Sequence, residues 1–410
     1  MQIDHPVTSL DPPPMLRGGC IEFPVHHMRG GTSTGLVIPE HWAPTERADR
    51  EELLRHLMGL PLEGTRAGNK QITGLGRIVP TGNKVFFARV EEAGNGQRIV
   101  GTFAQLAADK AAVDWSVNCG NMTAALPLWA LDTGQAEGVA GDAFEIDIFN
   151  TNTSVTTTSR MRLGADGRFA EAEIPGVDGS FPGVDLFLAN PVGAKTGRLL
   201  PTGNAVDSIA GYAVSCVDVA VPMVIARAAD FGKTAHEKIE QLEADRAFMS
   251  ALRAVWVEAG LRMALKGAGG RLMTADELAQ SETIPKICIV GPPDAAGHIA
   301  VRYFTPQNGH RSMAVSGGCC LAAAVLIPGS VAHEVARGVA GVGRDFTEVD
   351  VGIENPAGVL EATIEARLTS SGLEVRKAAY RRSTQILLRG HVPLYRASDA
   401  LRGALLPLCR

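Results

Sequence analysis

The stretch Asn118-Cys119-Gly120-Asn121, followed by Met122-Thr123-Ala124-Ala125-Leu126, decides the fold of this chain. A tight polar tetrapeptide opens a run of small and apolar residues, which predicts a short buried helix over residues 122–131. A helix start offers unpaired N–H groups and a positive dipole end, where a carboxylate can dock and a thiolate is favoured. The stretch therefore predicts proton transfer by Cys119 beside a bound carboxylate; the alternative is a buried cysteine in a turn.

The composition of the chain sets broad limits on its class. Its 410 residues suggest two domains or one large domain, and 45% hydrophobic with 20% charged residues is typical of a globular protein. The net charge of −5 gives no basic footprint for nucleic acid. Seven cysteines without a C-x-x-C pair indicate neither a disulfide framework nor a zinc site. Without a signal peptide pattern or a long apolar run, we expect a cytoplasmic protein that binds no membrane.

The two halves of the chain carry a faint repeat with a period near 200 residues. The strand Lys84-Val85-Phe86-Phe87 resembles Lys286-Ile287-Cys288-Ile289-Val290, which begins 202 positions later. Cys119-Gly120 corresponds to Gly317-Gly318, 198 positions later, and each pair opens a helix of small apolar residues. The repeat is asymmetric in its chemistry, because only the first helix start carries a thiol.

Each half thus predicts short strands, a surface helix (residues 51–60 or 241–259), more strands and a buried helix (122–131 or 321–327). Short strands punctuated by Gly and Pro fit curved antiparallel sheets, and a helix that is apolar all round needs cover on every side. We predict an α+β fold of two pseudo-symmetric domains, each a curved, mostly antiparallel sheet wrapped around a central apolar helix. The expected domains are residues 20–205 and 206–375, with a segment 376–395 completing the first, and the two helix starts are expected to face each other across a cleft.

Four motifs occur in a characteristic order: Met28-Arg29-Gly30-Gly31-Thr32-Ser33, Asn118-Cys119-Gly120-Asn121 with Pro127, Leu199-Leu200-Pro201-Thr202-Gly203-Asn204, and Pro285-Lys286-Ile287. With them the chain, from about residue 21 to 393, resembles the PrpF-like family of allylic isomerases. That family includes 2-methylaconitate isomerase and 4-oxalomesaconate tautomerase and has the diaminopimelate epimerase fold. Thr34, Thr73 and Arg77 depart from the family pattern, which leaves the substrate open.

The resemblance implies that Lys84 and Cys119 are the acid and base of a 1,3-proton shift. One group removes a proton next to a carboxylate, preorganised donors stabilise the dienolate, and the other group returns a proton at the far carbon. Neither a metal nor an organic cofactor is needed. The residues expected to bind substrate are Arg29, Gly30, Gly31, Thr32 and Ser33 in a glycine loop, Asn118, Gly120 and Asn121 at the first helix start, and His310, Arg311, Ser316, Gly317 and Gly318 at the second.

Each assignment has a plainer alternative: a solvated lysine, a glycine turn between strands, and a polar loop at His310 and Arg311. Two other function classes also remain. A racemase or epimerase would use a thiol at each helix start, whereas Cys319 and Cys320 lie inside the second helix. A non-catalytic carboxylate-binding protein would not need Lys84 and Cys119 together. Two anion sites predict a substrate with at least two carboxylates flanking a double bond. The acid itself, the order in which Lys84 and Cys119 act, the product isomer and the oligomeric state, including a homodimer, stay open.

Overall fold

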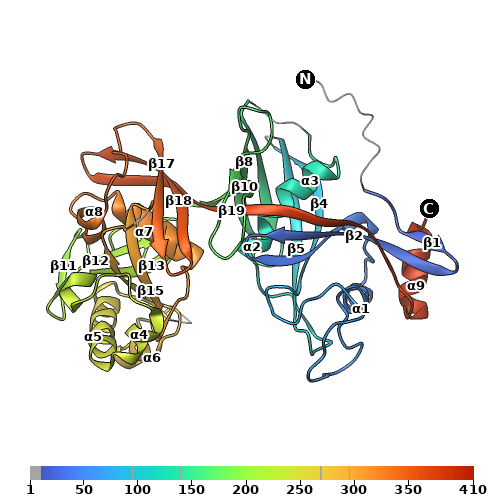
Figure 1. Cartoon of the computed structure of the whole chain (residues 1–410), viewed down its shortest axis with the longest axis horizontal. Helices are drawn as coiled ribbons and strands as arrows, with labels where there is room; N and C mark the ends of the chain where they lie inside the picture. The colour runs from blue at the N-terminus through green and yellow to red at the C-terminus, as the bar shows by residue number, and fades with distance from the viewer. Residues whose placement is uncertain (1–10, 95, 138–140, 268–269, 295) are drawn as a thin grey trace. The chain divides into compact units, whose positions relative to one another are not determined.

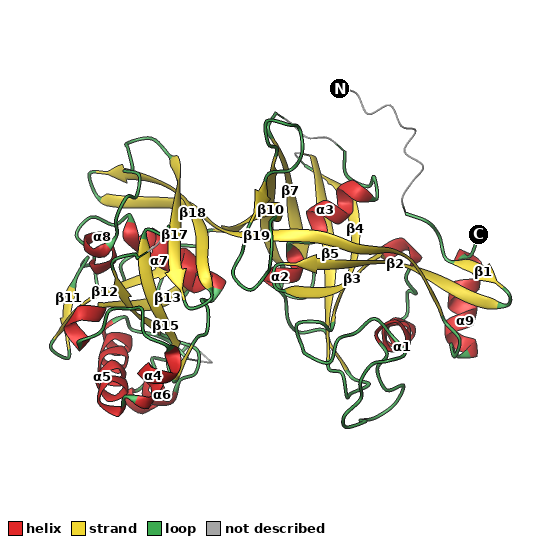
Figure 2. Cartoon of the chain, in the orientation of Figure 1, coloured by secondary structure: helices red, strands yellow, loops and turns green. Residues whose placement is uncertain are grey.

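The computed structural model describes residues 11–94, 96–137, 141–267, 270–294 and 296–410. The chain divides into two compact units (Figure 1). Unit 1 comprises Met1–Glu173, Val177–Leu186 and Arg382–Arg410, and unit 2 comprises Ile174–Gly176 and Phe187–Arg381. Each unit mixes strands and helices (Figure 2). No helix among the described residues is long and apolar enough to cross a membrane.

Unit 1 contains a curved sheet that surrounds two short helices. Strand β19 (Gly372–Pro393) pairs with β2, and the order continues as β19-β2-β3-β4-β5-β7-β8, with β3–β4 and β5–β7 parallel and the other pairs antiparallel. Helices α2 and α3 contact β2, β3, β4, β5 and β8, so the sheet wraps around them. The elements are β1 (Met15–Arg17), β2 (Cys20–Gly30), β3 (Ser33–Pro39), η1 (Glu40–Trp42), α1 (Arg47–Met58), β4 (Lys84–Ala93), β5 (Gly96–Leu106), β6 (Val113–Asp114), α2 (Gly120–Thr123), α3 (Leu126–Asp132), β7 (Ala143–Asn150), β8 (Val155–Arg162), β9 (Glu171–Ala172), α9 (Asp399–Leu405) and η3 (Leu406–Leu408).

Unit 2 repeats this topology. Its strands pair in the order β12-β13-β14-β15-β17-β18-β19, in which β13–β14 and β15–β17 are parallel and the other pairs antiparallel, so that β12 to β18 repeat the pattern of β2 to β8. The central helix α7 contacts β12, β13, β17 and β18. The elements are β11 (Asp207–Ile209), β12 (Tyr212–Val219), β13 (Val221–Arg227), η2 (Ala228–Phe231), α4 (Ile239–Ala244), α5 (Arg246–Arg262), α6 (Ala275–Gln280), β14 (Lys286–Gly291), β15 (Ile299–Thr305), β16 (Asn308–Gly309), α7 (Val315–Val325), α8 (Val331–Val335), β17 (Thr347–Asn355) and β18 (Gly358–Thr369).

The division between the units differs from the expected boundaries at residues 205 and 376. Strands β10 (Phe181–Ala189) and β19 (Gly372–Pro393) both run through it. The loop before β11 stays with unit 2 because the buried Asp218 carboxylate accepts hydrogen bonds from the N–H groups of Lys195 (2.9 Å) and Thr196 (2.8 Å). The C-terminal part joins unit 1 because β19 pairs with β2. The returning segment therefore starts at Arg382.

The internal repeat extends to the register of individual strand pairs. In unit 1, Phe86 of β4 lies opposite Phe103 of β5, and Lys84 precedes Phe86 by two residues. In unit 2, Cys288 of β14 lies opposite Tyr303 of β15. Lys286 precedes Cys288 by the same two residues, so both lysines begin equivalent strands.

The outer face of each sheet is covered by a surface helix. In unit 1, α1 buries four apolar side chains at helical spacing, namely Leu53, Leu54, Leu57 and Met58. They pack on β2, β3, β4 and β5 residues, and each contributes roughly 1.5–3 kcal/mol by leaving water. In unit 2, α5 packs in the same way on β13, β14 and β15, with Trp256 fully buried (Figure 1).

Two of the four predicted helices are interrupted. The prediction over residues 122–131 is wrong in that α2 ends at Thr123 and α3 begins at Leu126. Pro127 explains the break, because it has no N–H to donate to the carbonyl of Thr123. The prediction over residues 241–259 is likewise divided into α4 and α5 at Asp245, whose carboxylate accepts the N–H of Phe248 and caps α5. The other two lie close to the expected positions, as α1 and α7.

Candidate active site

The backbone around Cys119 is held from both sides. Its N–H donates to Asn118 Oδ1 at 2.7 Å, and that oxygen also accepts Asn150 Nδ2 at 3.1 Å. Its carbonyl accepts the N–H (2.9 Å) and the hydroxyl (3.0 Å) of Thr123. The thiol is half-buried and forms no disulfide. These bonds fix the position from which the Cys119 side chain projects.

The helix that begins after Cys119 is shorter than the sequence predicts, and this changes the electrostatic argument. Cys119 occupies the N-cap of α2, which has only four residues. A helix macrodipole grows from aligned peptide units, so α2 supplies little of the field that the continuous helix implied. What remains are the N–H groups of the first turn, beginning at Gly120, which have no partner within a helix.

The glycine turn between β2 and β3 lies directly against α2. A Cβ atom on Gly30 would approach Asn121 O to 2.3 Å, and one on Gly31, whose φ is +53°, would approach Asn121 Oδ1 to 2.2 Å. Asn121 Nδ2 donates to the Thr32 hydroxyl at 3.1 Å. Ser33 is buried, whereas Thr32 is exposed. The structure thus brings the glycine motif and the cysteine motif together within unit 1.

We expect Gly30→Ala to impair both stability and turnover. The added methyl group would clash with backbone atoms at Asn121 and Met122, so α2 must shift, and overpacking of this kind costs about 1–3 kcal/mol. Thermal unfolding and steady-state kinetics measure the two effects. Gly390→Ala is the matched control, because that strand glycine of the same unit has open space around it. Unchanged turnover in Gly30→Ala would contradict the close approach.

Arg29 is held by contacts within unit 1, on the side of the sheet opposite to α2. Its side chain points to the opposite face of the sheet from Gly30, because strand neighbours alternate. The Nη1 atom donates to the carbonyl oxygens of Gly31 (2.9 Å) and Ser383 (3.1 Å), and the guanidinium lies 4.6 Å from the ring centre of Phe181. Arg29 therefore shapes the turn and ties β2 to β19, and its role in substrate binding stays a prediction.

Lys84 is positioned by one amide side chain. The residue is 8% exposed, and its Nζ donates to Gln105 Oε1 at 2.5 Å. The Gln105 Nε2 atom donates to the carbonyl oxygens of Asn83 (3.0 Å) and Pro80 (3.1 Å). Because three backbone carbonyls, including that of Leu106, surround Nε2, the oxygen of the amide must face Lys84.

Lys84 and the helix that follows Cys119 share one face of the unit 1 sheet. Gly30 faces α2, and Met28, two residues earlier in β2, lies on the same face. Met28 pairs with Gly35, and Gly35 pairs with Lys84. Directly paired residues point to the same side, so the Lys84 side chain lies on the face that carries α2.

The second group of residues predicted to bind substrate lies just before and at the start of α7, and Arg311 differs from the others in that its side chain points outward. His310 is half-buried, and its ring centre lies 5.9 Å from that of Tyr303. Arg311 points outward, with an exposed side chain paired to Glu240 at 3.3 Å. The predicted contact of Arg311 with a distal carboxylate stays a prediction, because the side chain is exposed and its pair with Glu240 is a weak surface ion pair.

The glycines of α7 serve packing. A Cβ atom on Gly317 would lie 2.5 Å from the ring of Tyr303, and one on Gly318 would lie 2.7 Å from Leu360. The N–H of Gly318 donates to Ala314 O at 2.9 Å, so it is not available to an anion. Ser316 is the second residue of α7, so it lies at the helix start where the sequence predicts it.

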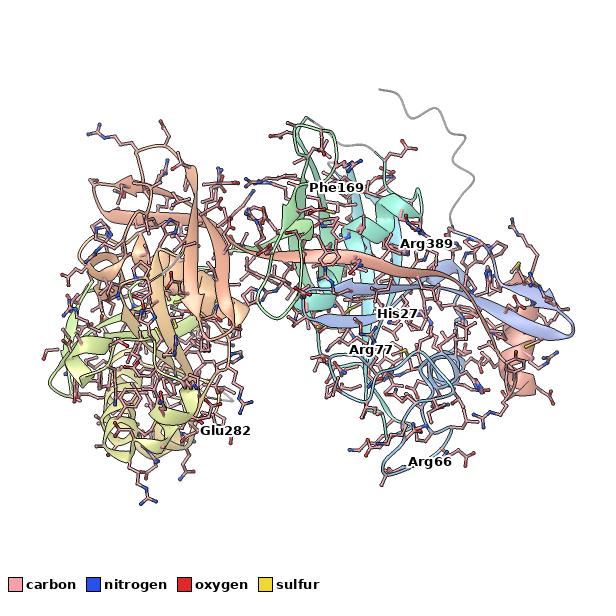
Figure 3. All side chains as sticks on the ribbon, in the orientation of Figure 1. His27, Arg66, Arg77, Phe169, Glu282 and Arg389 are labelled. Atoms are coloured by element: carbon pink, nitrogen blue, oxygen red, sulfur yellow. The ribbon has the colours of Figure 1, made fainter. Side chains whose placement is uncertain are left out.

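The departures from the family pattern lie in and around the loop before β4. Arg77 is exposed, and it lies near His27 (Figure 3). Burial lowers the pKa of His27, and the positive charge of Arg77 lowers it further. His27 belongs to the α1 face of the sheet, since it alternates with Met28. This places Arg77 beside a residue that faces away from α2.

Two positioning residues were not predicted from sequence. Gln105 orients Lys84, and Asn150 supports the Asn118 side chain that receives the Cys119 N–H. Gln105 lies directly opposite Lys84 in the pairing of β4 with β5, whereas Asn150 is brought in by the pairing of β5 with β7. The sequence could have indicated only Gln105, because β5 follows β4 directly and the two strands form a hairpin.

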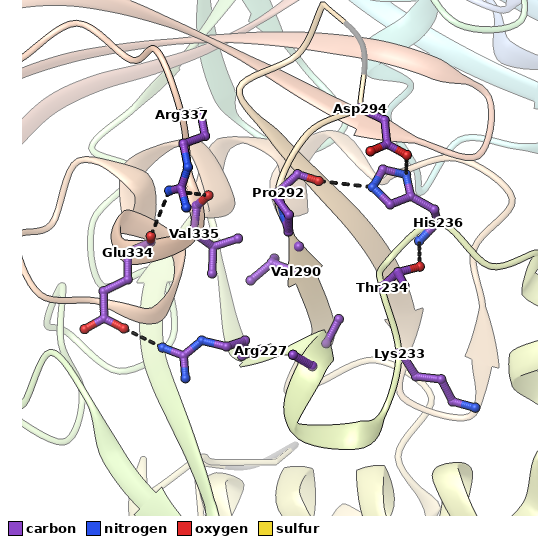
Figure 4. A pocket seen from close by; sticks show the side chains of 13 residues that line it. Arg227, Lys233, Thr234, His236, Val290, Pro292, Asp294, Glu334, Val335 and Arg337 are labelled. Carbon is purple, nitrogen blue, oxygen red and sulfur yellow. Dashed lines mark hydrogen bonds and ion pairs between the residues drawn. The ribbon is translucent and has the colours of Figure 1, made fainter.

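A separate cavity of about 700 Å³ lies in unit 2 (Figure 4). Its charged residues are largely paired: Arg227 contacts Glu334, His236 lies 3.4 Å from Asp294, and Arg337 donates to carbonyl oxygens at the end of α8. None of the residues predicted from sequence lines it, so we do not assign it as the active site. In the described part of the chain, no three His, Cys, Asp or Glu side chains group as a metal site would require.

Comparisons with known proteins place this geometry in context. The sequence model of a family described as PrpF protein matches residues 20–395. The 4-oxalomesaconate tautomerase of Pseudomonas putida is 32% identical over 353 residues, covering 85% of this chain and 90% of that protein. The (4E)-oxalomesaconate Delta-isomerase of a Novosphingobium species is 32% identical over 371 residues, covering 90% and 96%. The crystal structure of a methylitaconate-delta-isomerase shares the fold, with a TM-score of 0.74 at 24% identity and coverage of 92% and 97%.

Proposed function

Because this chain belongs to the PrpF family of isomerases, we propose that it moves a carbon–carbon double bond by a 1,3-proton shift in an unsaturated tricarboxylic acid. The oxalomesaconate type is the substrate class that the names of two relatives favour. Lys84 lies on the face of the unit 1 sheet that carries α2, the helix that begins directly after Cys119. This placement is the observation that carries the proposal.

The chemistry uses these two groups as a pair. One removes the proton at the carbon next to a carboxylate or carbonyl group, and the other delivers a proton at the far carbon of the allylic system. In the reverse direction the two groups exchange roles. The Gln105 amide holds the Lys84 Nζ in place, and the bonds to Asn118 and Thr123 hold Cys119. Proton transfer by such a pair requires neither a metal nor an organic cofactor.

The first carboxylate is assigned to the turn that joins the two motifs. The exposed Thr32 hydroxyl and the Asn121 amide lie together there, next to the unpaired N–H groups at the start of α2. Glycines 30 and 31 allow this close approach because they have no side chains. The bound carboxylate would hold the acidic C–H near Cys119.

A racemase that uses two opposed thiols is the weaker alternative. In the repeat, Gly317 stands at the position of Cys119, so the start of α7 carries no thiol there. Cys319 and Cys320 are fully buried inside α7, and burial raises the pKa of the Cys320 thiol well above its usual value. A thiol in that environment is a poor base.

The proposal is tested by proton exchange in heavy water. The protein is incubated with 4-oxalomesaconate, cis-aconitate or 2-methylaconitate, and NMR follows deuterium at the allylic carbons. We expect deuterium incorporation with a shift of the double bond for at least one tricarboxylate. A monocarboxylic alkenoate serves as the control substrate, and faster exchange with it than with every di- and tricarboxylate would contradict the proposal.

A further inference from the structure

We propose that Asn83 is a positioning residue for Lys84, which it holds for proton transfer through Gln105 from the opposite face of the unit 1 sheet. Asn83 directly precedes β4, so its side chain and that of Lys84 point to opposite faces. The inference rests on the proposed function for the task of Lys84, whereas the positioning follows from contacts within unit 1. Gln71 completes the arrangement as the partner of Asn83.

The side chain of Asn83 ties together the turn before β4. Asn83 is fully buried, and its Nδ2 atom donates to the carbonyl oxygens of Arg77 (2.9 Å) and Val79 (3.1 Å). The turn is closed by the N–H of Arg77, which donates to Gly82 O at 3.2 Å, and by the N–H of Gly82, which donates to Val79 O at 2.9 Å. The Asn83 amide therefore fixes the path of the backbone over residues 77–82.

Gln71 fixes the orientation of the Asn83 amide. Because Nδ2 of Asn83 faces two carbonyls, its Oδ1 has to face the other way, where it accepts Gln71 Nε2 at 2.5 Å. The same Nε2 atom donates to Met58 O at 2.9 Å, at the C-terminal end of α1. A carboxylate at either position would place one oxygen against another, so the arrangement requires an amide at both.

Gln71 occupies its position at a local cost. Its φ is +51°, in the left-handed region that favours glycine. Its Oε1 atom is buried and, in the described part of the chain, accepts no hydrogen bond. Strained backbone and unpaired buried groups persist only where the surrounding structure enforces them, and they concentrate at functional sites. Both costs fall on the residue that orients Asn83, which favours a functional role for this contact.

The backbone of the same turn holds Gln105. Its Nε2 atom donates to the carbonyl oxygens of Asn83 (3.0 Å) and Pro80 (3.1 Å), and its Oε1 atom accepts Lys84 Nζ at 2.5 Å. The N–H of Leu106 also donates to Asn83 O at 3.0 Å. The positions of these two carbonyls depend on the turn that the Asn83 side chain ties together. A displaced turn would let the Gln105 amide rotate and would release the Lys84 Nζ.

Unit 2 provides an internal comparison for this arrangement. Lys286 is the counterpart of Lys84, because both lysines begin equivalent strands. The residue before Lys286 is Pro285, which has no side-chain amide, and the same register makes Thr305 the counterpart of Gln105. The two amides thus accompany the lysine of the unit that has a thiol at its helix start, and other residues replace them at the lysine of the other unit.

The test first measures how firmly Lys84 is held, without any substrate. A limiting amount of acetic anhydride is added to the folded full chain, and peptide mass spectrometry gives the acetylation rate of Lys84 relative to that of the exposed Lys110. We expect Asn83→Ala and Gln105→Met each to speed acetylation of Lys84 by at least about threefold. The double variant should react no faster than Gln105→Met alone, because Asn83 acts through Gln105.

Steady-state kinetics with an acid that is turned over then separate positioning from a purely structural role. Asn83→Ala should lower kcat by about tenfold and change KM by less than about threefold. In the Gln105→Met background the same substitution should cause no further loss of kcat. A structural defect that did not act through Gln105 would instead multiply with the effect of Gln105→Met.

Asn69→Ala is the matched control. Asn69 lies in the same loop, and its Nδ2 atom donates to the carbonyl oxygens of Gly59 (2.9 Å) and Ala108 (2.7 Å). The substitution removes two amide–carbonyl bonds, as Asn83→Ala does, but leaves the turn before β4 in place. We expect wild-type acetylation of Lys84 and wild-type kcat for this variant, and thermal unfolding shows whether each variant folds.

Wild-type acetylation of Lys84 in folded Asn83→Ala would overturn the inference, and so would an effect on kcat that multiplies with that of Gln105→Met. Should Asn83→Ala fail to fold, Gln71→Met carries the same test, because it keeps the side-chain length and removes the donor to Asn83 Oδ1. Unchanged acetylation in that variant would then overturn the inference. If acetylation changes as expected but no acid exchanges protons in heavy water, the positioning of Lys84 stands and the proposed isomerisation fails.

Discussion

Replacing Cys119 with alanine is expected to lower turnover by about 10²- to 10⁴-fold, the usual consequence of losing a positioned acid or base. The variant should fold normally, because the thiol is half-buried and the bonds that hold residue 119 involve only its N–H and carbonyl. Steady-state kinetics with a tricarboxylate and thermal unfolding measure the two quantities. Tricarballylate is a saturated tricarboxylate that has no double bond to move. Its affinity for the variant should change little, because the proposed carboxylate contacts come from Thr32, Asn121 and the N–H groups at the start of α2.

The matched control is Cys20→Ala. Cys20 is also a half-buried free cysteine of unit 1, but it begins β2, at the opposite end of that strand from Gly30. We expect this variant to keep turnover within about threefold of the wild type. Near-normal turnover in Cys119→Ala would remove this thiol from the mechanism.

Lys84→Met is expected to lower kcat over the same range of about 10²- to 10⁴-fold. Methionine keeps the length of the aliphatic side chain but cannot donate the hydrogen bond that Gln105 Oε1 accepts from Lys84. Some stability should be lost as well, because the Gln105 oxygen loses its charged partner, an effect of about 1–3 kcal/mol. Binding of tricarballylate should be retained, which assigns the loss to chemistry.

Lys110→Met is the control for Lys84→Met, as it removes an exposed lysine from the same unit. We expect wild-type kcat and KM for this variant. Should Lys84→Met bind tricarballylate poorly and retain its kcat, Lys84 would be a carboxylate anchor and the proton transfer would need another partner.

Local sequence patterns were sufficient for the elements and for the repeat. The apolar stripe of α1, the lysine that begins β4 and β14, and the small-residue helix α7 all lie close to where their patterns predict. These features depend on residues that are near one another in the chain, where periodicity and turn residues act directly. The motif around Cys119 could be recognised for the same reason.

Errors arose where one residue changes the local rule. Pro127 interrupts the predicted buried helix, because a proline cannot complete the hydrogen bond to the preceding turn. The close packing at two of the predicted glycines was not foreseen either: Gly30 lies against the backbone of Asn121 and Gly317 against the ring of Tyr303, which requires glycine whether or not an anion binds nearby. A sequence shows that a side chain is missing at such a position and does not show what fills the space.

The chain's own residues therefore specified strands, helices and the duplication, and the resemblance to a known family singled out Lys84 and Cys119 as the predicted catalytic pair. The direction and partner of each side chain followed only from the folded sheet. Strand alternation sends Arg29 away from α2, and the register of β4 against β5 delivers the amide of Gln105 to Lys84. The physical reason is that side-chain direction has a period of two, so a shift of one residue in pairing exchanges the faces. The pairing of β19 with β2, which places the partners of Arg29, joins segments far apart in the chain, whereas β4 and β5 form a hairpin.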